Sequence, residues 1–269
     1  MPSAVDDRIE ACARALEGGD TKAALAEATA ATQAASELDL ETRLRAERTA
    51  LLVEAECGLF DQAERRADAM RLALEPSSPA RALLLADLAH IAMLRGRRDD
   101  AETRLRTAID VVDEVATEPG LAPVPVLAAL AALLAARDRR GLDEAKQLTA
   151  RVLDLLLEAG DEPLAVADTL AFRALLDARS GEFSGARTLS GQAIEIYTST
   201  SAPRERIAAA LMVAAEAAHA LGQTEDARAL RSQLAEVTND NSVSNEFERA
   251  LAYFARSLRL ELRRSVGLG

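Results

Sequence analysis

The chain has 269 residues, a formal net charge of −12 and a pI near 4.8. An acidic chain repels a phosphate backbone, so we exclude nucleic acid as its main ligand and expect a basic peptide or basic protein surface to be attracted instead. Hydrophobic residues make up 49% of the chain and aromatic residues only 3%. A core of closely packed Ala, Leu and Val is therefore expected, in a composition that favours helices.

Targeting and membrane signals are not apparent. The first residues, MPSAVDDRIE, lack the basic segment and apolar run of a secretory signal. The densest apolar run, Val124 to Ala136, is too short to span a bilayer. We therefore expect a cytoplasmic protein that contacts no membrane. Cys12 and Cys57 lie within helical patterns, outside any CxxC or Cys/His spacing, so we interpret them as small packing residues and expect neither a disulfide nor a metal site.

A repeated turn organises the chain. A glycine is followed five residues later by an alanine at Gly19, Gly58, Gly96, Gly181 and Gly222. A degenerate copy has Arg140 in the glycine place, Ala145 five residues later and Gly141 shifted by one residue. The period is about forty residues. The glycine can take the left-handed backbone that ends a helix, and the alanine lets the next helix approach closely, so antiparallel helix pairs are expected.

The predicted helices follow in chain order. The first helices of the pairs are expected at residues 5–17, 41–57, 79–95, 124–138, 164–179 and 204–221, and the second helices at 22–38, 62–74, 100–116, 143–158, 185–197 and 225–237. Polar residues after the turns are expected to cap the second helices, namely Asp20, Asp61, Asp99, Ser184 and Thr224. Ser78 before Pro79 predicts a capped helix start.

The sequence thus predicts an all-α protein, a right-handed α-solenoid of about six antiparallel helix pairs. A last helix at 245–264 has an apolar face and several arginines, as expected of a helix that caps a repeat array. No boundary interrupts the period, so residues 1–269 are expected to form a single domain. Its repeats would cover about 4–39, 40–78, 79–120, 121–162, 163–202 and 203–240.

The copy around Gly96 resembles a tetratricopeptide repeat (TPR), and weaker copies extend the resemblance over nearly the whole chain. The matching residues are Leu85, Leu88, Ala89, Ala92, Gly96, Ala101 and Ala108. The period of about forty exceeds the thirty-four residues usual for the family, and its large aromatic residues are mostly absent, Phe60 and Phe183 excepted. Long, alanine-rich repeats of this kind are similar to helical arrays in bacterial signalling proteins and transcriptional regulators.

The resemblance implies a concave groove lined by the first helix of each pair. Residues thirteen, ten, six and three places before each turn glycine would face it. The partner-binding candidates are Arg45, Arg48, Leu52, Leu83, Ala86, His90, Met93, Leu130, Arg137, Glu216 and His219. The leucines have a second interpretation, as ordinary core between helices, and both interpretations stay open at this point. The two histidines lack an HExxH or Cys/His pattern, so we interpret them as packing or peptide-contacting residues and expect no metal.

Enzyme motifs do not appear in the sequence. The segment Gly181 to Gly185 resembles a nucleophile elbow, but Ser184 lies one place late and no strand is expected before it. No glycine-rich phosphate loop with a lysine occurs. We therefore expect a protein that is not an enzyme and that needs no cofactor.

Two functions of different classes fit these observations. The first is a non-enzymatic scaffold that binds a peptide or helical segment of a partner protein. The second is a ligand- or peptide-responsive sensory module of a bacterial regulatory system, in which the ligand shifts the curvature of the array. A thermal-shift screen against metabolites distinguishes the two. Formation of a homo-oligomer through apolar ends of the stack is a third alternative, which light scattering tests.

Overall fold

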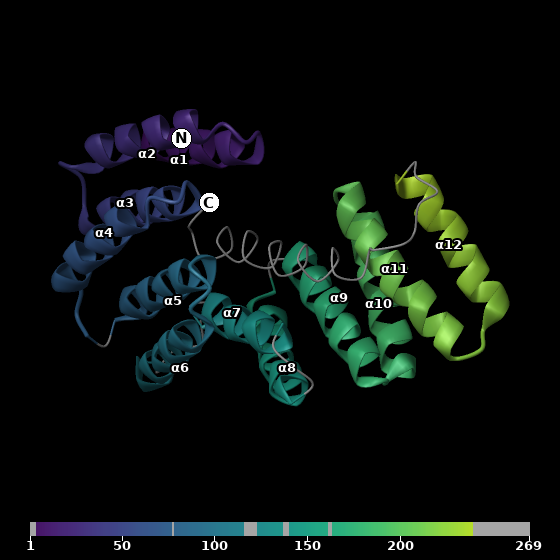
Figure 1. The fold of residues 1–269 in the computed structure, drawn as a ribbon. Coiled ribbons are helices and arrows are strands. Elements are labelled where there is room, and N and C mark those ends of the chain that lie inside the picture. Colours follow the sequence, from purple (N-terminus) through teal and green to yellow (C-terminus); the bar gives the residue numbers. More distant parts are fainter. Residues whose placement is uncertain (1–3, 77, 116–122, 137–139, 161–162, 239–269) are drawn as a thin grey trace. The chain divides into compact units, whose positions relative to one another are not determined.

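The computed structural model describes residues 4–76, 78–115, 123–136, 140–160 and 163–238. Twelve helices and no strand occur in these ranges (Figure 1). Each odd-numbered helix packs against the even-numbered helix that follows it. The predicted all-α fold of consecutive helix pairs is therefore confirmed. None of the described helices is long and apolar enough to cross a membrane.

The helices fall into two compact units. Unit 1 contains α1 (Ala4–Glu17), α2 (Thr21–Ala35), α3 (Leu40–Glu56), α4 (Phe60–Ala73), α5 (Pro79–Leu94) and α6 (Arg98–Val115). Unit 2 contains α7 (Val124–Ala135), α8 (Gly141–Ala159), α9 (Pro163–Ser180), α10 (Phe183–Ser199), α11 (Arg204–Ala220) and α12 (Thr224–Thr238). The predicted capping helix at 245–264 lies outside the described residues, and the single domain stays a prediction.

The turn glycines have the backbone that the repeat predicts. Their φ angles lie between 74° and 85° at Gly19, Gly58, Gly96, Gly181 and Gly222. At Gly96, the N–H donates to the Met93 carbonyl at 2.9 Å, and the next N–H donates to the Ala92 carbonyl at 2.8 Å. These bonds satisfy carbonyls at the end of α5. The alanine five residues after each turn is at most 1% exposed, as expected where two helices cross.

The fourth copy uses its glycine differently. Gly141 is the first residue of α8 and has helical backbone. A Cβ at this position would lie 2.6 Å from the Leu134 carbonyl oxygen of α7. The one-residue shift of the glycine therefore moves it from the turn to a close contact between α7 and α8.

Two predicted helix caps are confirmed. Asp20 caps α2, where its carboxylate accepts a hydrogen bond from the Ala23 N–H at 2.9 Å. Ser78 caps α5, and its hydroxyl accepts from the Arg81 N–H at 3.3 Å, with Pro79 as the first helical residue. Each cap satisfies an N–H group that has no partner within its helix.

The other four predicted caps are wrong. Asp61, Asp99 and Ser184 lie inside the first turn of their helices, and Thr224 is itself a first helical residue. These helices begin closer to the turn glycine than the sequence predicts. The two aspartates still complement the positive end of the helix dipole there.

Both cysteines are free thiols. Cys12 is 1% exposed and packs in a small core with Ala24, Ala28, Ala50 and Val53. Burial raises the pKa of its thiol to about 11. Cys57 is only partly buried. Within the described part of the chain, no cluster of three or more His, Cys, Asp or Glu residues could hold a metal ion.

Candidate functional site

The first helices of unit 1 lie next to one another. Helix α3 contacts both α1 and α5, and we call the surface that these three helices form the first-helix face. Polar contacts join them along this face. Arg45 of α3 pairs with Asp6 of α1, and an Arg–Asp ion pair and a His–Glu hydrogen bond join α3 to α5.

The pair between Arg48 and Asp87 is buried. Arg48 Nε donates to Asp87 Oδ2 at 2.6 Å, and Nη2 donates to Oδ1 at 3.1 Å. The two side chains are 9% and 7% exposed. This two-point geometry is the strongest form of an ion pair between arginine and a carboxylate. Arg48 therefore fixes α3 against α5 and does not present a free charge to a partner.

His90 occupies the second contact between these helices. Its Nε2 lies 2.7 Å from Glu56 Oε1, and its side chain is 10% exposed. This geometry is that of a hydrogen-bonded packing residue, one of the two roles that the sequence left open. Because so little of the side chain is exposed, a partner that contacts His90 must contact the residues around it as well.

The apolar candidates of unit 1 fall into two groups, buried residues and partly exposed ones. Leu52 and Leu83 are each 8% exposed, so they belong to the core between helices. Ala86 and Met93 of α5 are partly exposed. They lie seven residues apart, which places them on one side of the helix, with His90 between them. Among the candidates of unit 1, Ala86 and Met93 therefore supply the accessible apolar surface.

The candidates of unit 2 lie on different helices and differ in exposure. Leu130 of α7 is 1% exposed and lies in the core. Glu216 and His219 are exposed on α11. Arg137 lies outside the described residues. The structure therefore leaves Glu216 and His219 as the accessible candidates of this unit.

A buried polar cluster holds α9, α10 and α11 together. Asp168 of α9 is fully buried, and its Oδ1 accepts a hydrogen bond from the Tyr197 hydroxyl of α10 at 2.6 Å. Its Oδ2 lies 3.4 Å from Nη2 of Arg206 of α11, whose side chain is 6% exposed. The cluster positions three helices of unit 2. Asp168 lies thirteen places before Gly181, so the spacing rule of the sequence analysis predicts only that it faces the groove.

A second polar contact joins α8 to the turn between α9 and α10. Lys146 Nζ donates to Glu182 Oε1 at 2.6 Å. This hydrogen bond, together with the lysine charge, lowers the pKa of Glu182. A lowered carboxyl pKa means that the pair contributes at neutral pH and is lost only as the pH falls through that lowered value.

These inter-helix pairs carry a signal in the sequence. Arg45 follows Asp6 by 39 residues, and Asp87 follows Arg48 by 39 residues. Both separations match one repeat period. Opposite charges one period apart on first helices therefore indicate contacts between successive repeats. This signal in the sequence could have shown which charged side chains hold helices together and which are available to a partner.

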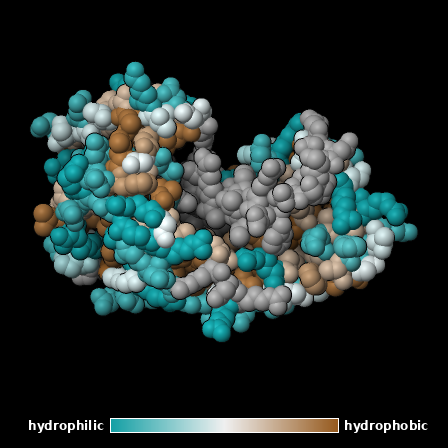
Figure 2. Space-filling model, in the orientation of Figure 1, coloured by the Kyte–Doolittle hydropathy of each residue, from teal (hydrophilic) through white to brown (hydrophobic). Residues whose placement is uncertain are grey.

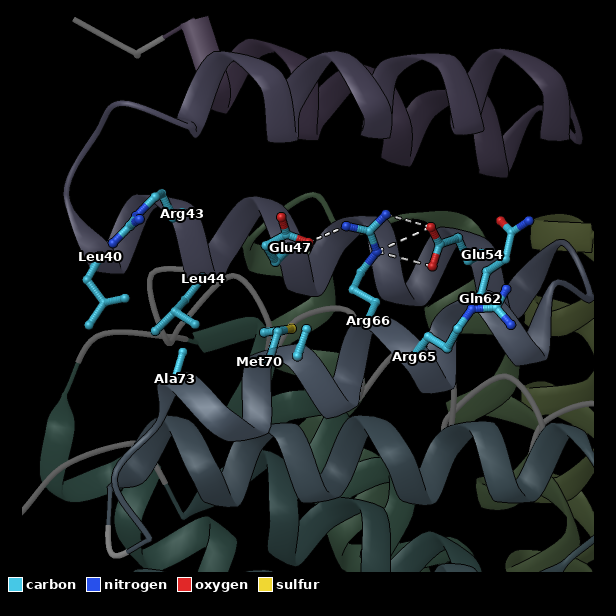
Figure 3. Close-up of a pocket in the computed structure, with 11 residues that line it drawn as sticks. Leu40, Arg43, Leu44, Glu47, Glu54, Gln62, Arg65, Arg66, Met70 and Ala73 are labelled. Carbon is cyan, nitrogen blue, oxygen red and sulfur yellow. Dashed lines mark hydrogen bonds and ion pairs between the residues drawn. The ribbon is translucent and has the colours of Figure 1, made fainter.

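The structure also contains a groove that sequence reasoning missed. It runs between α3 and α4, has a volume of about 630 Å³ and is open to solvent (Figure 3). The lining residues are Leu40, Arg43, Leu44, Glu47, Glu54, Gln62, Arg65, Arg66, Ala69, Met70 and Ala73. Neither Arg45 nor Arg48 lines this groove. The TPR resemblance pointed to a groove lined by first helices, whereas this one lies between a first helix and the second helix that follows it.

Comparison with known proteins identifies the fold class. No protein-family model and no curated protein match the chain. BtubC (BKLC) from P. vanneervenii superposes with a TM-score of 0.67 at 15% identity, over 88% of this chain and 92% of that one. The apo form of RapI gives 0.66 at 11% identity, over 99% and 76%.

A third structure has repeats of the same kind. TPR-like repeats from Podospora anserina, described as a kinesin light chain, give a TM-score of 0.60 at 19% identity. They cover 74% of this chain and 98% of that one. The protein therefore has the fold of a TPR-like helical repeat protein, as the residues around Gly96 predict. At these identities, the similarity establishes the fold alone.

Proposed function

We propose that this protein is a non-enzymatic scaffold whose first-helix face binds a peptide or helical segment of a partner protein. The observation that carries the proposal is the surface around α5. Ala86 and Met93 are partly exposed on one side of this helix, and His90 and Arg45 lie on the same face of unit 1. An accessible apolar strip bordered by polar side chains is typical of a protein-binding surface.

The ion pairs of unit 1 support this role because they fix the face before a partner arrives. Arg48 and Asp87 hold α3 against α5, and Arg45 and Asp6 hold α3 against α1. A face fixed in advance loses little conformational entropy on binding. In unit 2, considered by itself, Glu216 and His219 are exposed on α11 and are proposed as partner contacts of that unit.

The charge of the chain favours one kind of partner for this face. The net charge of −12 attracts a basic segment over long range and increases the rate of association. The apolar contact with Met93 would then supply much of the affinity, since charged rims contribute more to the rate than to the strength of binding.

A charge introduced into the apolar strip tests the proposal. We expect Met93→Glu to reduce capture of the partner from a lysate of the source organism at least tenfold, because a carboxylate would be buried in an apolar contact. Captured proteins would be quantified by mass spectrometry against the unmodified protein as bait. Circular dichroism would confirm that helicity is unchanged.

Leu157→Glu provides the matched control. Leu157 is 59% exposed on α8, a second helix of unit 2, so the change adds the same charge at an accessible apolar residue that is not part of the first-helix face. Capture should be unaffected by this variant. Equal capture by the unmodified protein and the Met93→Glu variant would remove the support for a binding role of the first-helix face.

A further inference from the structure

The α3–α4 groove has two unlike halves. Its apolar half combines Leu40 and Leu44 of α3 with Met70 and Ala73 of α4 (Figure 3). Leu40 is 49% exposed, while Met70 is only 4% exposed and forms the floor. The apolar half is thus an accessible depression with a packed base.

Charged residues occupy the middle of the groove, where they neutralise one another. Arg66 Nη2 donates to Glu54 Oε1 at 2.7 Å, and Arg66 also contacts Glu47. Hydrogen bonding to Glu54 raises the pKa of the Arg66 guanidinium. This arginine is therefore held between two carboxylates and has little capacity left for a ligand (Figure 3).

Two other arginines are available. Arg43 and Arg65 line the groove and are exposed, and neither forms an ion pair within the described part of the chain. Arg43 lies beside Leu40 and Leu44, and Arg65 lies beside Gln62 at the other end (Figure 3). The groove thus has an exposed guanidinium towards each end, on a chain whose net charge is −12.

Two exposed leucines neighbour the apolar half of the groove in the sequence. Leu72 is 81% exposed and precedes Ala73, and Leu38 is 45% exposed and lies two residues before Leu40. Figure 2 shows one face of the molecule, on which hydrophobic residues reach the surface among mostly hydrophilic ones. Isolated exposed leucines need no explanation, but several beside one groove indicate a contact surface.

We propose that the α3–α4 groove is a second docking surface, and that it binds an acidic amphipathic helix of a partner protein. Apolar side chains of that helix pack against Leu40, Leu44 and Met70, and its carboxylates pair with Arg43 and Arg65. The proposal does not depend on the first-helix face, which lies elsewhere on unit 1 and favours basic segments.

The dimensions of the groove match this occupant. The lining residues of α3 run from Leu40 to Glu54, which corresponds to about 21 Å along a helix axis. A partner helix of about fourteen residues has the same length. An open trough between two helices suits an amphipathic helix laid along it, whereas pockets for small molecules enclose most of the ligand surface.

Selection from a peptide library tests the chemistry of the occupant directly. Phage displaying random sixteen-residue peptides would be selected on the immobilised full-length protein. The enriched peptides should contain apolar residues spaced three and four apart, flanked by Asp or Glu. In fluorescence anisotropy, the synthetic peptides should bind the Arg43→Ala/Arg65→Ala variant at least tenfold more weakly than the unmodified protein.

Matched variants distinguish the groove from general electrostatics. Arg228→Ala/Arg231→Ala removes two exposed arginines from α12 and should leave peptide binding unchanged. Ala69→Glu places a carboxylate inside the groove, one helical turn from Arg65, and should abolish binding while preserving the helix.

Several results would overturn the proposal. These are enrichment of basic or charge-free peptides, no enrichment at all, or equal binding by the Arg43→Ala/Arg65→Ala and Arg228→Ala/Arg231→Ala variants. Dimerisation in light scattering that Ala69→Glu abolishes would instead make a second copy of this chain the occupant. The Met93→Glu variant should still bind the peptides, so failure of the first-helix face leaves this result unaffected.

Discussion

Asp168→Ala is expected to lower the free energy of unfolding by about 3–5 kcal/mol, because it removes one partner of a buried ion pair. Asp168 is fully buried between Tyr197 and Arg206. Without the carboxylate, the buried Arg206 side chain loses this counter-charge and the Tyr197 hydroxyl loses its acceptor. Urea denaturation followed by circular dichroism measures the effect as a shift of the unfolding transition.

Two companion variants separate charge from packing. Tyr197→Phe removes only the hydroxyl that donates to Asp168, so a smaller loss of about 1.5–3 kcal/mol is expected. Asp143→Ala removes an aspartate whose side chain is 84% exposed, and its effect should stay within about 0.5 kcal/mol. If Asp168→Ala were no more destabilising than Asp143→Ala, the buried cluster would not be the contact that joins α9 to α11.

Arg48→Ala is the second change with a large expected effect. It leaves Asp87 without its bidentate partner in a site where both side chains are less than a tenth exposed. A loss of about 3–5 kcal/mol is expected in the free energy of unfolding of unit 1. Arg14→Ala, which removes an arginine 63% exposed on α1, serves as the control and should cost no more than about 0.5 kcal/mol.

A double-mutant cycle isolates the Arg48–Asp87 interaction. Arg48→Ala and Asp87→Ala should each be strongly destabilising, and the double variant should lose less than the sum of the two. Replacing the pair with Arg48→Met/Asp87→Leu should recover most of the stability, because apolar residues of similar size need no counter-charge. Strict additivity of the single variants would mean that the two side chains do not stabilise unit 1 through each other.

Most of the local structure followed from the sequence. The turn glycines and the alanines after them, such as Gly96 and Ala101, predicted helix pairs whose observed ends differ by at most three residues. This succeeded because a left-handed glycine and a small residue at a helix crossing are requirements of local geometry. Gly141 shows the limit of the rule, since its one-residue shift reflects the close approach of Leu134, which only the packed structure reveals.

The roles of the charged residues were harder to predict from the sequence than the helix pairs were. Helical spacing placed Arg45 and Arg48 on one face, but it did not show that each has a carboxylate partner on the neighbouring first helix. Whether a charge is free depends on residues a full repeat away. The α3–α4 groove could not be predicted for a related reason. Arg43 and Arg66 both lie in ordinary helical sequence, and only the packed structure shows that Arg66 pairs with two carboxylates while Arg43 is exposed.

The central claim is that the first-helix face binds a partner protein, and site-specific photo-cross-linking tests it most directly. A benzoylphenylalanine would replace Met93 in one preparation and the exposed Leu157 in another. Each protein would be irradiated in a lysate of the source organism and its adducts identified by mass spectrometry. The account predicts a discrete protein adduct at position 93 that is absent at position 157. The same adducts at both positions, or none at position 93, would contradict it.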